Sequence, residues 1–213
     1  AQFNIAVGAT ALNAITTGDQ NIAIGHDALG ASTTSSSNTV IGYQAGSSIT
    51  TGSTLATLVG YQAGGALTLG LRNSAFGYSA LNSNTTGNDN TAVGYQALSA
   101  LNEDGGNQPI DNTAVGSKAG EKATTGDKGT YIGSQAGKEV TTANNNTFIG
   151  ALAGAATITG EDNVTIAAES LFTNILGQQS VAIGSKALYK SNVLNAKNVA
   201  IGYHAGEQTT TGV

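Results

Sequence analysis

Tyrosines recur at one spacing along the first half of this chain, and they are the side chains best suited to contact a ligand. They stand 17 or 18 residues apart, as Tyr43, Tyr61, Tyr78 and Tyr95, and the series returns at Tyr203. A phenol ring combines an apolar face with a hydroxyl group and is favoured at interfaces. The series is therefore a candidate stacking platform for sugars or a receptor contact. The alternative is packing at an edge of the fold or between copies of the chain.

A second candidate is the segment 101–111, LNEDGGNQPID, where the regular spacing is interrupted. It contains the only proline and the densest group of carboxylates in the chain, and Glu103 and Asp104 are its candidate ligand contacts. Loops on rigid scaffolds often carry recognition, but the residues do not follow the EF-hand calcium pattern. The segment predicts an inserted surface loop that either contacts a receptor or a cation or is simply tolerated.

The composition excludes most other chemistry. With no cysteine there is no disulfide framework, thiolate zinc site or cysteine nucleophile. The two histidines, His26 and His204, stand too far apart in the repeat to share a metal ion, and no Ser/His/Asp set is suggested by position. We therefore expect no catalytic residues, no metal site, no cofactor and no enzymatic activity. The net charge of −5 argues against nucleic acid, and no apolar run approaches the roughly 18 residues of a membrane span.

The tyrosines belong to a repeat that covers residues 1–213 as a single array of about twelve units. Its motif is N-x-A-[V/I]-G-x-x-A-[L/G], as in NIAVGATAL from Asn4 and NTAVGYQAL from Asn90. Positions are counted from the first residue of the motif, so Asn4 holds position 1 and the tyrosines hold position 6. Most units are 17 residues long. A fixed period of this kind is the sequence signature of a solenoid.

Each unit is expected to form one coil of an all-β, parallel β-solenoid. Positions 2 to 4 alternate as a strand does, while the glycine at position 5 and the Thr-Thr-Gly at positions 13 to 15 predict two bends. We therefore expect two short strands per coil and no helix. The β-branched residues at position 4, such as Ile132 and Ile149, are expected to fill the core. The apolar residues at position 3, such as Ala75 and Phe148, are then expected outside as a stripe that joins copies of the chain.

Two polar series have structural explanations. The asparagine at position 1 favours turns and can stack its amide on the equivalent amide of the next coil. The threonines at positions 13 and 14 are expected to form the bend with stacked hydroxyls. Their regularity also raises ice binding as an alternative, although adjacent threonines in a strand point to opposite faces.

With its Thr/Gly bend, the repeat resembles the head repeat of YadA-like trimeric autotransporter adhesins. It is even more similar to the NTAVGYQAL-type arrays of phage tail fibres and large bacterial surface proteins. The resemblance covers the whole chain and implies a left-handed parallel β-roll in a homotrimer, exposed outside a cell, on a cell surface or on a virion (tail fibre). The units differ from the adhesin heads in being longer and in having NTAVG where those have NSVAIG-type strands.

We therefore expect an extracellular structural and adhesive segment of a longer fibre. It would present a repetitive trimeric surface for host or cell-surface attachment, to a surface glycan or a protein receptor. The first alternative is a purely structural spacer or a self-assembling filament with end-to-end contacts. A polysaccharide-processing fibre and an ice-binding protein are the remaining alternatives.

Overall fold

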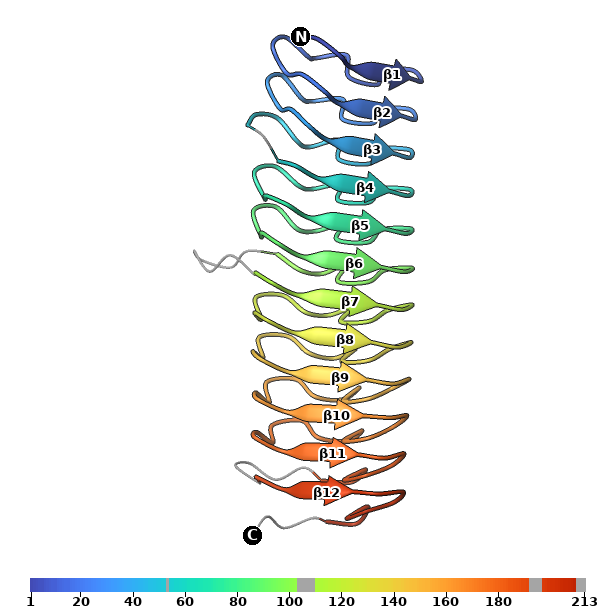
Figure 1. Cartoon of the computed structure of the whole chain (residues 1–213), viewed down its shortest axis with the longest axis vertical. Helices are drawn as coiled ribbons and strands as arrows, with labels where there is room; N and C mark the ends of the chain where they lie inside the picture. The colour runs from blue at the N-terminus through green and yellow to red at the C-terminus, as the bar shows by residue number, and fades with distance from the viewer. Residues whose placement is uncertain (53, 103–109, 192–196, 210–213) are drawn as a thin grey trace.

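The computed structural model describes the chain except for residues 53, 103–109, 192–196 and 210–213. Its twelve strands form one parallel sheet in which neighbours along the chain are also neighbours in space, so the protein is an all-β solenoid (Figure 1). The strands are β1 (Ile5–Val7), β2 (Ile22–Ile24), β3 (Thr39–Ile41), β4 (Thr57–Val59), β5 (Ser74–Phe76), β6 (Thr91–Val93), β7 (Thr113–Val115), β8 (Thr130–Ile132), β9 (Thr147–Ile149), β10 (Val164–Ile166), β11 (Val181–Ile183) and β12 (Val199–Ile201).

One coil consists of a three-residue strand and the turns that lead to the next strand. The second strand predicted for each coil is absent from the described residues, where turns and bends form the return path. Backbone hydrogen bonds still join the coils there, as from Gln44 N–H to His26 C=O (2.9 Å) and from Leu29 N–H to Ala45 C=O (3.1 Å). Equivalent positions of successive units therefore lie above one another. No helix among the described residues is long and apolar enough to cross a membrane.

The strand face that packs in the core is the opposite of the predicted one. The middle residue, at position 3, is fully buried in β2 to β11, while position 4 is half-exposed or exposed throughout. Phe148 is 0% exposed, for example, whereas Ile132 is 37% exposed. The prediction was wrong because both positions are apolar in most units, and we assigned the larger β-branched side chains to the interior. Position 3 is alanine in seven of the twelve units, and in most of those coils the large side chain of the interior is a leucine at position 9.

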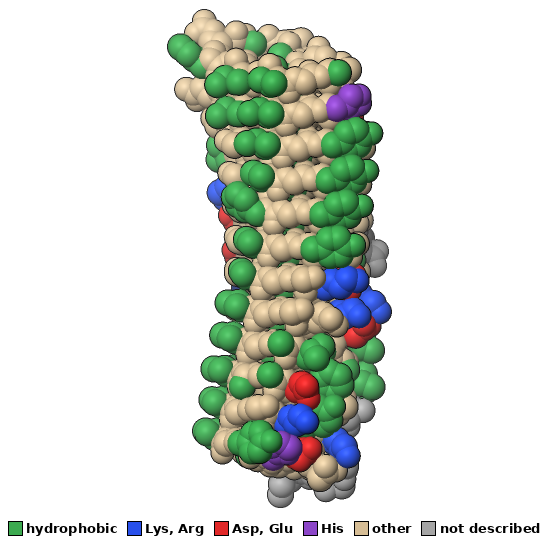
Figure 2. Space-filling model, turned by 90° about the vertical axis from the view of Figure 1, so that its right-hand side faces the viewer, with side chains coloured by type: hydrophobic (Ala, Val, Ile, Leu, Met, Phe, Trp, Pro, Cys, Tyr) green, Lys and Arg blue, Asp and Glu red, His purple; other side chains and the backbone are tan. Residues whose placement is uncertain are grey.

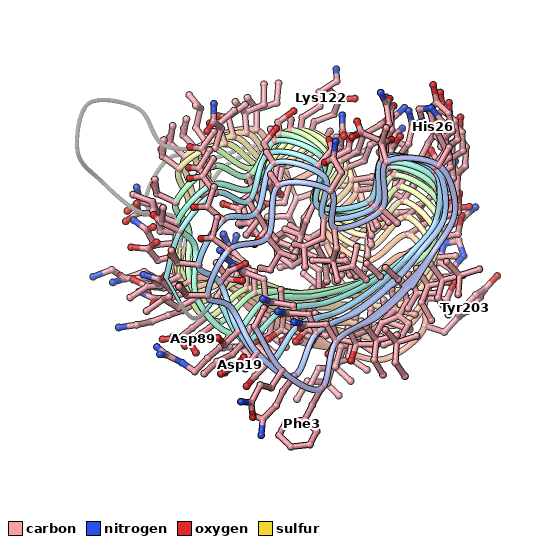
Figure 3. All side chains as sticks on the ribbon, turned by 90° about the horizontal axis from the view of Figure 1, so that it is seen from above. Phe3, Asp19, His26, Asp89, Lys122 and Tyr203 are labelled. Atoms are coloured by element: carbon pink, nitrogen blue, oxygen red, sulfur yellow. The ribbon has the colours of Figure 1, made fainter. Side chains whose placement is uncertain are left out.

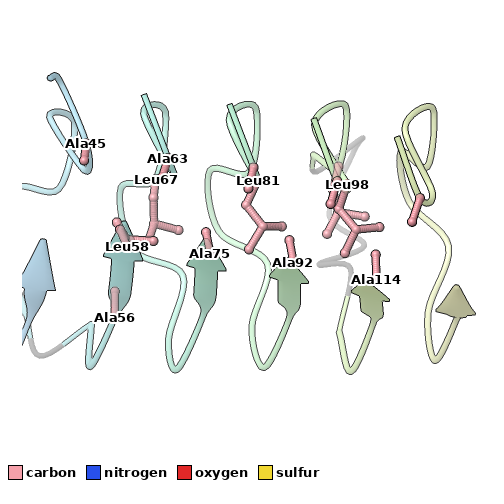
Figure 4. Close-up of a cluster of buried hydrophobic side chains, with 14 of the residues drawn as sticks. Ala45, Ala56, Leu58, Ala63, Leu67, Ala75, Leu81, Ala92, Leu98 and Ala114 are labelled. Carbon is pink, nitrogen blue, oxygen red and sulfur yellow. The ribbon is translucent and has the colours of Figure 1, made fainter. Parts of the chain in front are cut away.

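Positions 3 and 9 share the interior in a size-dependent way. Leucine at position 9 accompanies a small residue at position 3, as in the β5 coil with Ala75 and Leu81, which belong to one buried cluster (Figure 4). A large residue at position 3 accompanies glycine at position 9, because a Cβ at Gly154 would lie 2.5 Å from the Phe148 ring. Where both are small, as in the β7 coil, the rings and leucines of adjacent coils enter the space: a Cβ at Gly120 would meet Leu98 and Tyr131 side-chain atoms at 2.8 Å.

The asparagines at position 1 form the predicted amide ladder inside the solenoid. Asn112 is fully buried, and its Nδ2 donates to Asn90 Oδ1 (3.1 Å) and to the Gly126 carbonyl (2.8 Å). Its own Oδ1 accepts the backbone N–H of Gly129 at 2.8 Å. The Asn112 amide therefore ties its coil to both neighbouring coils.

Replacing Asn112 with alanine is expected to lower the free energy of unfolding by about 1–3 kcal/mol, because it leaves the buried Gly129 N–H without its acceptor. Urea titration followed by circular dichroism measures this loss. The matched control is Asn13→Ala, at an exposed asparagine. Equal losses for the two variants would contradict a structural role for the ladder.

Candidate functional site

The four candidate tyrosines form a continuous stack at one corner of the solenoid. Ring centroids are 5.2 Å apart for Tyr43 and Tyr61, 4.9 Å for Tyr61 and Tyr78, and 5.3 Å for Tyr78 and Tyr95, with interplanar angles of 4° to 20°. His26 extends the stack at one end, 5.3 Å from Tyr43. Figure 2 shows the stack as a column of apolar side chains below a histidine. The in-register coils bring together these four predicted residues.

The corner turn positions the tyrosines. In the coils of β3 and β4, the N–H of position 8 donates to the carbonyl of the glycine at position 5, from Ala45 to Gly42 (3.4 Å) and from Ala63 to Gly60 (3.3 Å). Position 7 has a positive φ, 51° at Gln44 and 52° at Gln62, as the third residue of a type II turn requires. At position 5, φ is 140° at Gly60, and a Cβ there would lie 2.3 Å from the Gly77 carbonyl oxygen. Glycine suits both the turn and the close stacking of coils, and only the β10 coil has another residue at position 5, Ala167 with a φ of 112°.

Stacking changes what the tyrosines offer to a ligand. Tyr61 and Tyr78 are 41% and 47% exposed, but each has an aromatic ring on both faces. Their exposed parts are therefore ring edges and hydroxyl groups. A sugar cannot stack on the inner rings without opening the stack, so the corner favours hydrogen bonding and edge contact over the predicted face-on platform.

The other candidates lie elsewhere. Glu103 and Asp104 fall outside the described residues, so the structure adds nothing on their predicted role. The described ends of the 101–111 segment are anchored to the solenoid: Leu101 is fully buried, and Ile110 N–H donates to Asp127 Oδ1 at 3.0 Å. Tyr203 stands in the last coil, apart from the stack, with its ring edge-on to His204.

A groove runs beside the aromatic corner, and sequence reasoning missed it. Viewed along the rod, the path of the coil dents inward between the lobe carrying His26 and the lobe carrying Lys122 (Figure 3). A cavity of about 400 Å³ lies in the coils of β3 to β6, and one of about 170 Å³ lies in the coils of β8 to β10. Residues at positions 7, 10 and 11 line both cavities. The groove is thus a feature of the fold, and its side chains differ from one stretch to another.

Charged groups on the surface pair mainly between coils or within a turn. Arg72 Nε and Nη2 donate to the two carboxylate oxygens of Asp89 at 2.6 and 2.7 Å, and this hydrogen bonding lowers the pKa of the Asp89 carboxyl and raises that of Arg72. Lys122 hydrogen-bonds to Glu139, which raises the lysine pKa. Such pairs between coils hold neighbouring coils together.

The threonine series serves mainly to join coils. The hydroxyls of Thr16, Thr33 and Thr68 donate to the position 13 carbonyl of the next coil at 2.9 to 3.0 Å. This agrees with the predicted bend of stacked hydroxyls. A hydroxyl that already donates to a carbonyl is less suited to order water for ice binding.

The described residues contain no group of three or more His, Cys, Asp or Glu side chains placed to hold a metal ion. Comparisons of the chain with protein-family models, with curated proteins and with solved structures find no match.

Proposed function

We propose that the chain is a segment of an extracellular structural and adhesive fibre, located on a cell surface or a virion. Three copies associate into a homotrimer of left-handed β-rolls and present a repetitive surface for attachment to a host or another cell. The single observation that carries this proposal is the apolar stripe on the exposed face of the sheet.

The stripe consists of the position 4 residues, one from each strand. Five of its members in the middle of the sheet are 37% to 40% exposed: Phe76, Val93, Val115, Ile132 and Ile166. Positions 2 and 4 carry no charged residue in any unit. Figure 2 shows apolar side chains along the opposite edge of the view from the tyrosine stack, over the length of the rod.

A stripe of this length supports self-association. Monomeric soluble proteins rarely expose extended contiguous apolar surface, and an uncharged face meets a copy of itself without electrostatic repulsion. The stripe at position 4 takes the role that the sequence had suggested for position 3. The choice of three copies rests on the resemblance of the repeat to trimeric adhesins and tail fibres.

Placing lysine at Ile132 and Ile149 together is expected to convert the trimer into monomers, because it would bring up to six charges into one interface. Sedimentation velocity at several protein concentrations measures the change. The matched control is Ser134→Lys with Ala151→Lys, which adds the same charges to the same two coils at exposed residues off the stripe. A wild-type chain that sediments as a folded monomer would refute the trimer.

Attachment is tested by adding the fluorescently labelled trimer to a panel of bacterial and animal cells. The monomeric double-lysine variant is expected to bind about a hundredfold more weakly than the trimer, because three linked contacts replace one. If the wild-type trimer binds no cell in the panel, the structural spacer becomes the better explanation.

The tyrosine stack has its own test in the same assay. Changing Tyr61 and Tyr78 together to serine is expected to reduce attachment while the protein stays folded, because the interior residues of positions 3 and 9 are unchanged. Thermal unfolding measured alongside separates the two roles. If the double variant unfolds and attachment is lost only for that reason, the tyrosines are stabilising residues.

A further inference from the structure

The groove and the tyrosine stack change character at the same coil. Through the coils of β3 to β6, position 6 is tyrosine, and no groove-lining residue is charged. The lining consists of amide, hydroxyl and small side chains: Gln44, Ser47, Ser48, Gln62, Gly65, Ala66, Asn82, Ser83, Thr85 and Asn102. From the β7 coil onward, position 6 is serine or alanine until β12, and charged residues enter positions 10 and 11 as Glu121, Lys122, Lys138 and Glu139. Nothing in the repeat requires these changes to coincide, so the coils of β3 to β6 form one distinct surface. Its groove is called the upper groove below.

This upper groove has polar groups available to a ligand. Gln62 Nε2 donates to Gln44 Oε1 at 3.1 Å, and this bond does not use Gln44 Nε2 or Gln62 Oε1. Within the described part of the chain, no side-chain hydrogen bond engages Ser48, Asn82 or Ser83, although all three line the cavity and are only half-buried. Amides and hydroxyls both donate and accept, so the groove matches a ligand rich in hydroxyl groups and without charge.

An extended peptide fits the groove less well. A peptide that adds a strand needs free backbone groups at a sheet edge, but the groove floor uses its backbone N–H groups within the solenoid. Ala66 N–H donates to Asn82 C=O (2.9 Å), and Ser83 N–H donates to Ser99 C=O (3.1 Å). The upper groove also has no charged side chain to select a charged peptide and no large apolar side chain to bury a hydrophobic one.

We infer that the upper groove, from Gln44 to Asn102, binds a neutral polysaccharide along the axis of the rod. The inference rests on the proposed attachment function and names its ligand class. Successive coils are spaced by about 4.8 Å, a distance similar to the advance of one sugar in an extended glycan, so equivalent side chains meet successive sugars. The tyrosine hydroxyls and ring edges lie on the adjoining corner and border the site. Many weak, repeated contacts replace one deep pocket.

The test is calorimetric titration of the wild-type protein with neutral glucan, mannan and galactan oligosaccharides of increasing length, and with uronic-acid and sulfated oligosaccharides. At least one neutral series is expected to bind with an affinity that rises with length, and the anionic series are expected to bind more weakly. Combining Gln62→Ala with Asn82→Ala is expected to weaken the neutral ligand by about tenfold or more, since hydrogen bonds from two coils are lost. The matched control is Gln135→Ala, at the same repeat position as Gln62 and with a similar φ of 59°. Gln135 lines the separate cavity in the coils of β8 to β10, so its replacement should leave the affinity within about twofold.

A second variant, Ser83→Lys, tests the groove with a substitution that is expected to fold. Ser83→Lys places at position 11 a residue that the fold already accepts there as Lys122, and it should block the groove with a charged chain. If no neutral glycan binds, or if the Gln62/Asn82 double variant and Ser83→Lys both bind like wild type, the inference is wrong. Cell attachment by a wild type that binds no neutral glycan would reject the groove and keep the attachment function. Glycan binding without cell attachment would keep the groove as a glycan site and reject the attachment function.

Discussion

Replacing Phe148 with alanine is expected to lower the free energy of unfolding by about 3–5 kcal/mol per chain. Its ring is fully buried, lies 5.8 Å from the Tyr131 ring and occupies the space left by Gly137 and Gly154. Truncation would remove this packing and leave a cavity in the narrow core inside the coil. Guanidinium titration at several protein concentrations measures the loss, which should be the same at each concentration because the defect lies inside one chain.

The control is Ile132→Ala, in the neighbouring strand but on the outer face. Ile132 is 37% exposed, so its truncation is expected to cost less, and mainly through association between chains. Were Ile132→Ala the more damaging of the two in a chain shown to be monomeric, the outer face assigned to position 4 would be wrong.

The repeat was sufficient to predict the solenoid and its ladders. A period near 17 residues places equivalent side chains above one another. This alone predicts the amide ladder at Asn90 and Asn112 and the stack of Tyr61 on Tyr78. These features depend only on register, which the spacing fixes without knowledge of the path of the coil.

Which face of each strand is buried was not predictable from the strand residues themselves. In β9, for example, Phe148 and Ile149 are both large and apolar, and a three-residue strand is too short for alternation to separate them. The sequence does hold a signal outside the strand. Leucine at position 9 occurs with alanine or threonine at position 3, and Val40, Leu58, Tyr131 and Phe148 occur with glycine. Such compensation in size indicates that positions 3 and 9 share one space, which places position 3 inside.

The groove was missed for a different reason. Its walls come from positions 7, 10 and 11, whose relative placement depends on turns with positive φ at non-glycine residues such as Gln62. Residue types seldom predict that conformation, because it is uncommon for any residue with a side chain. The sequence showed only that these positions are uncharged in the coils of β3 to β6. That they line one groove became apparent only from the turns that bring them together.

The compensation between positions 3 and 9 gives the second large expected effect, a rescue. Gly154→Leu alone is expected to destabilise the chain by at least about 1–3 kcal/mol through overpacking, because even a Cβ there would lie 2.5 Å from the Phe148 ring. Combined with Phe148→Ala, the new leucine fills the vacated space, and the β9 coil acquires the alanine–leucine pair of the β5 and β6 coils. The double variant should therefore be more stable than either single variant.

Backbone conformation does not prevent this rescue. Gly154 has a φ of 57°, and leucines at the same position already adopt φ values of 52° at Leu81 and 48° at Leu98. The coupling energy from the four unfolding curves is expected to reach or exceed about 2 kcal/mol in the stabilising direction, as for residues that share a cavity. Additive losses would mean that the two positions do not share one space and that their pairing in size along the chain has another origin. A measured rescue would show that positions 3 and 9 share one interior space in the β9 coil, so that either residue can supply the larger side chain.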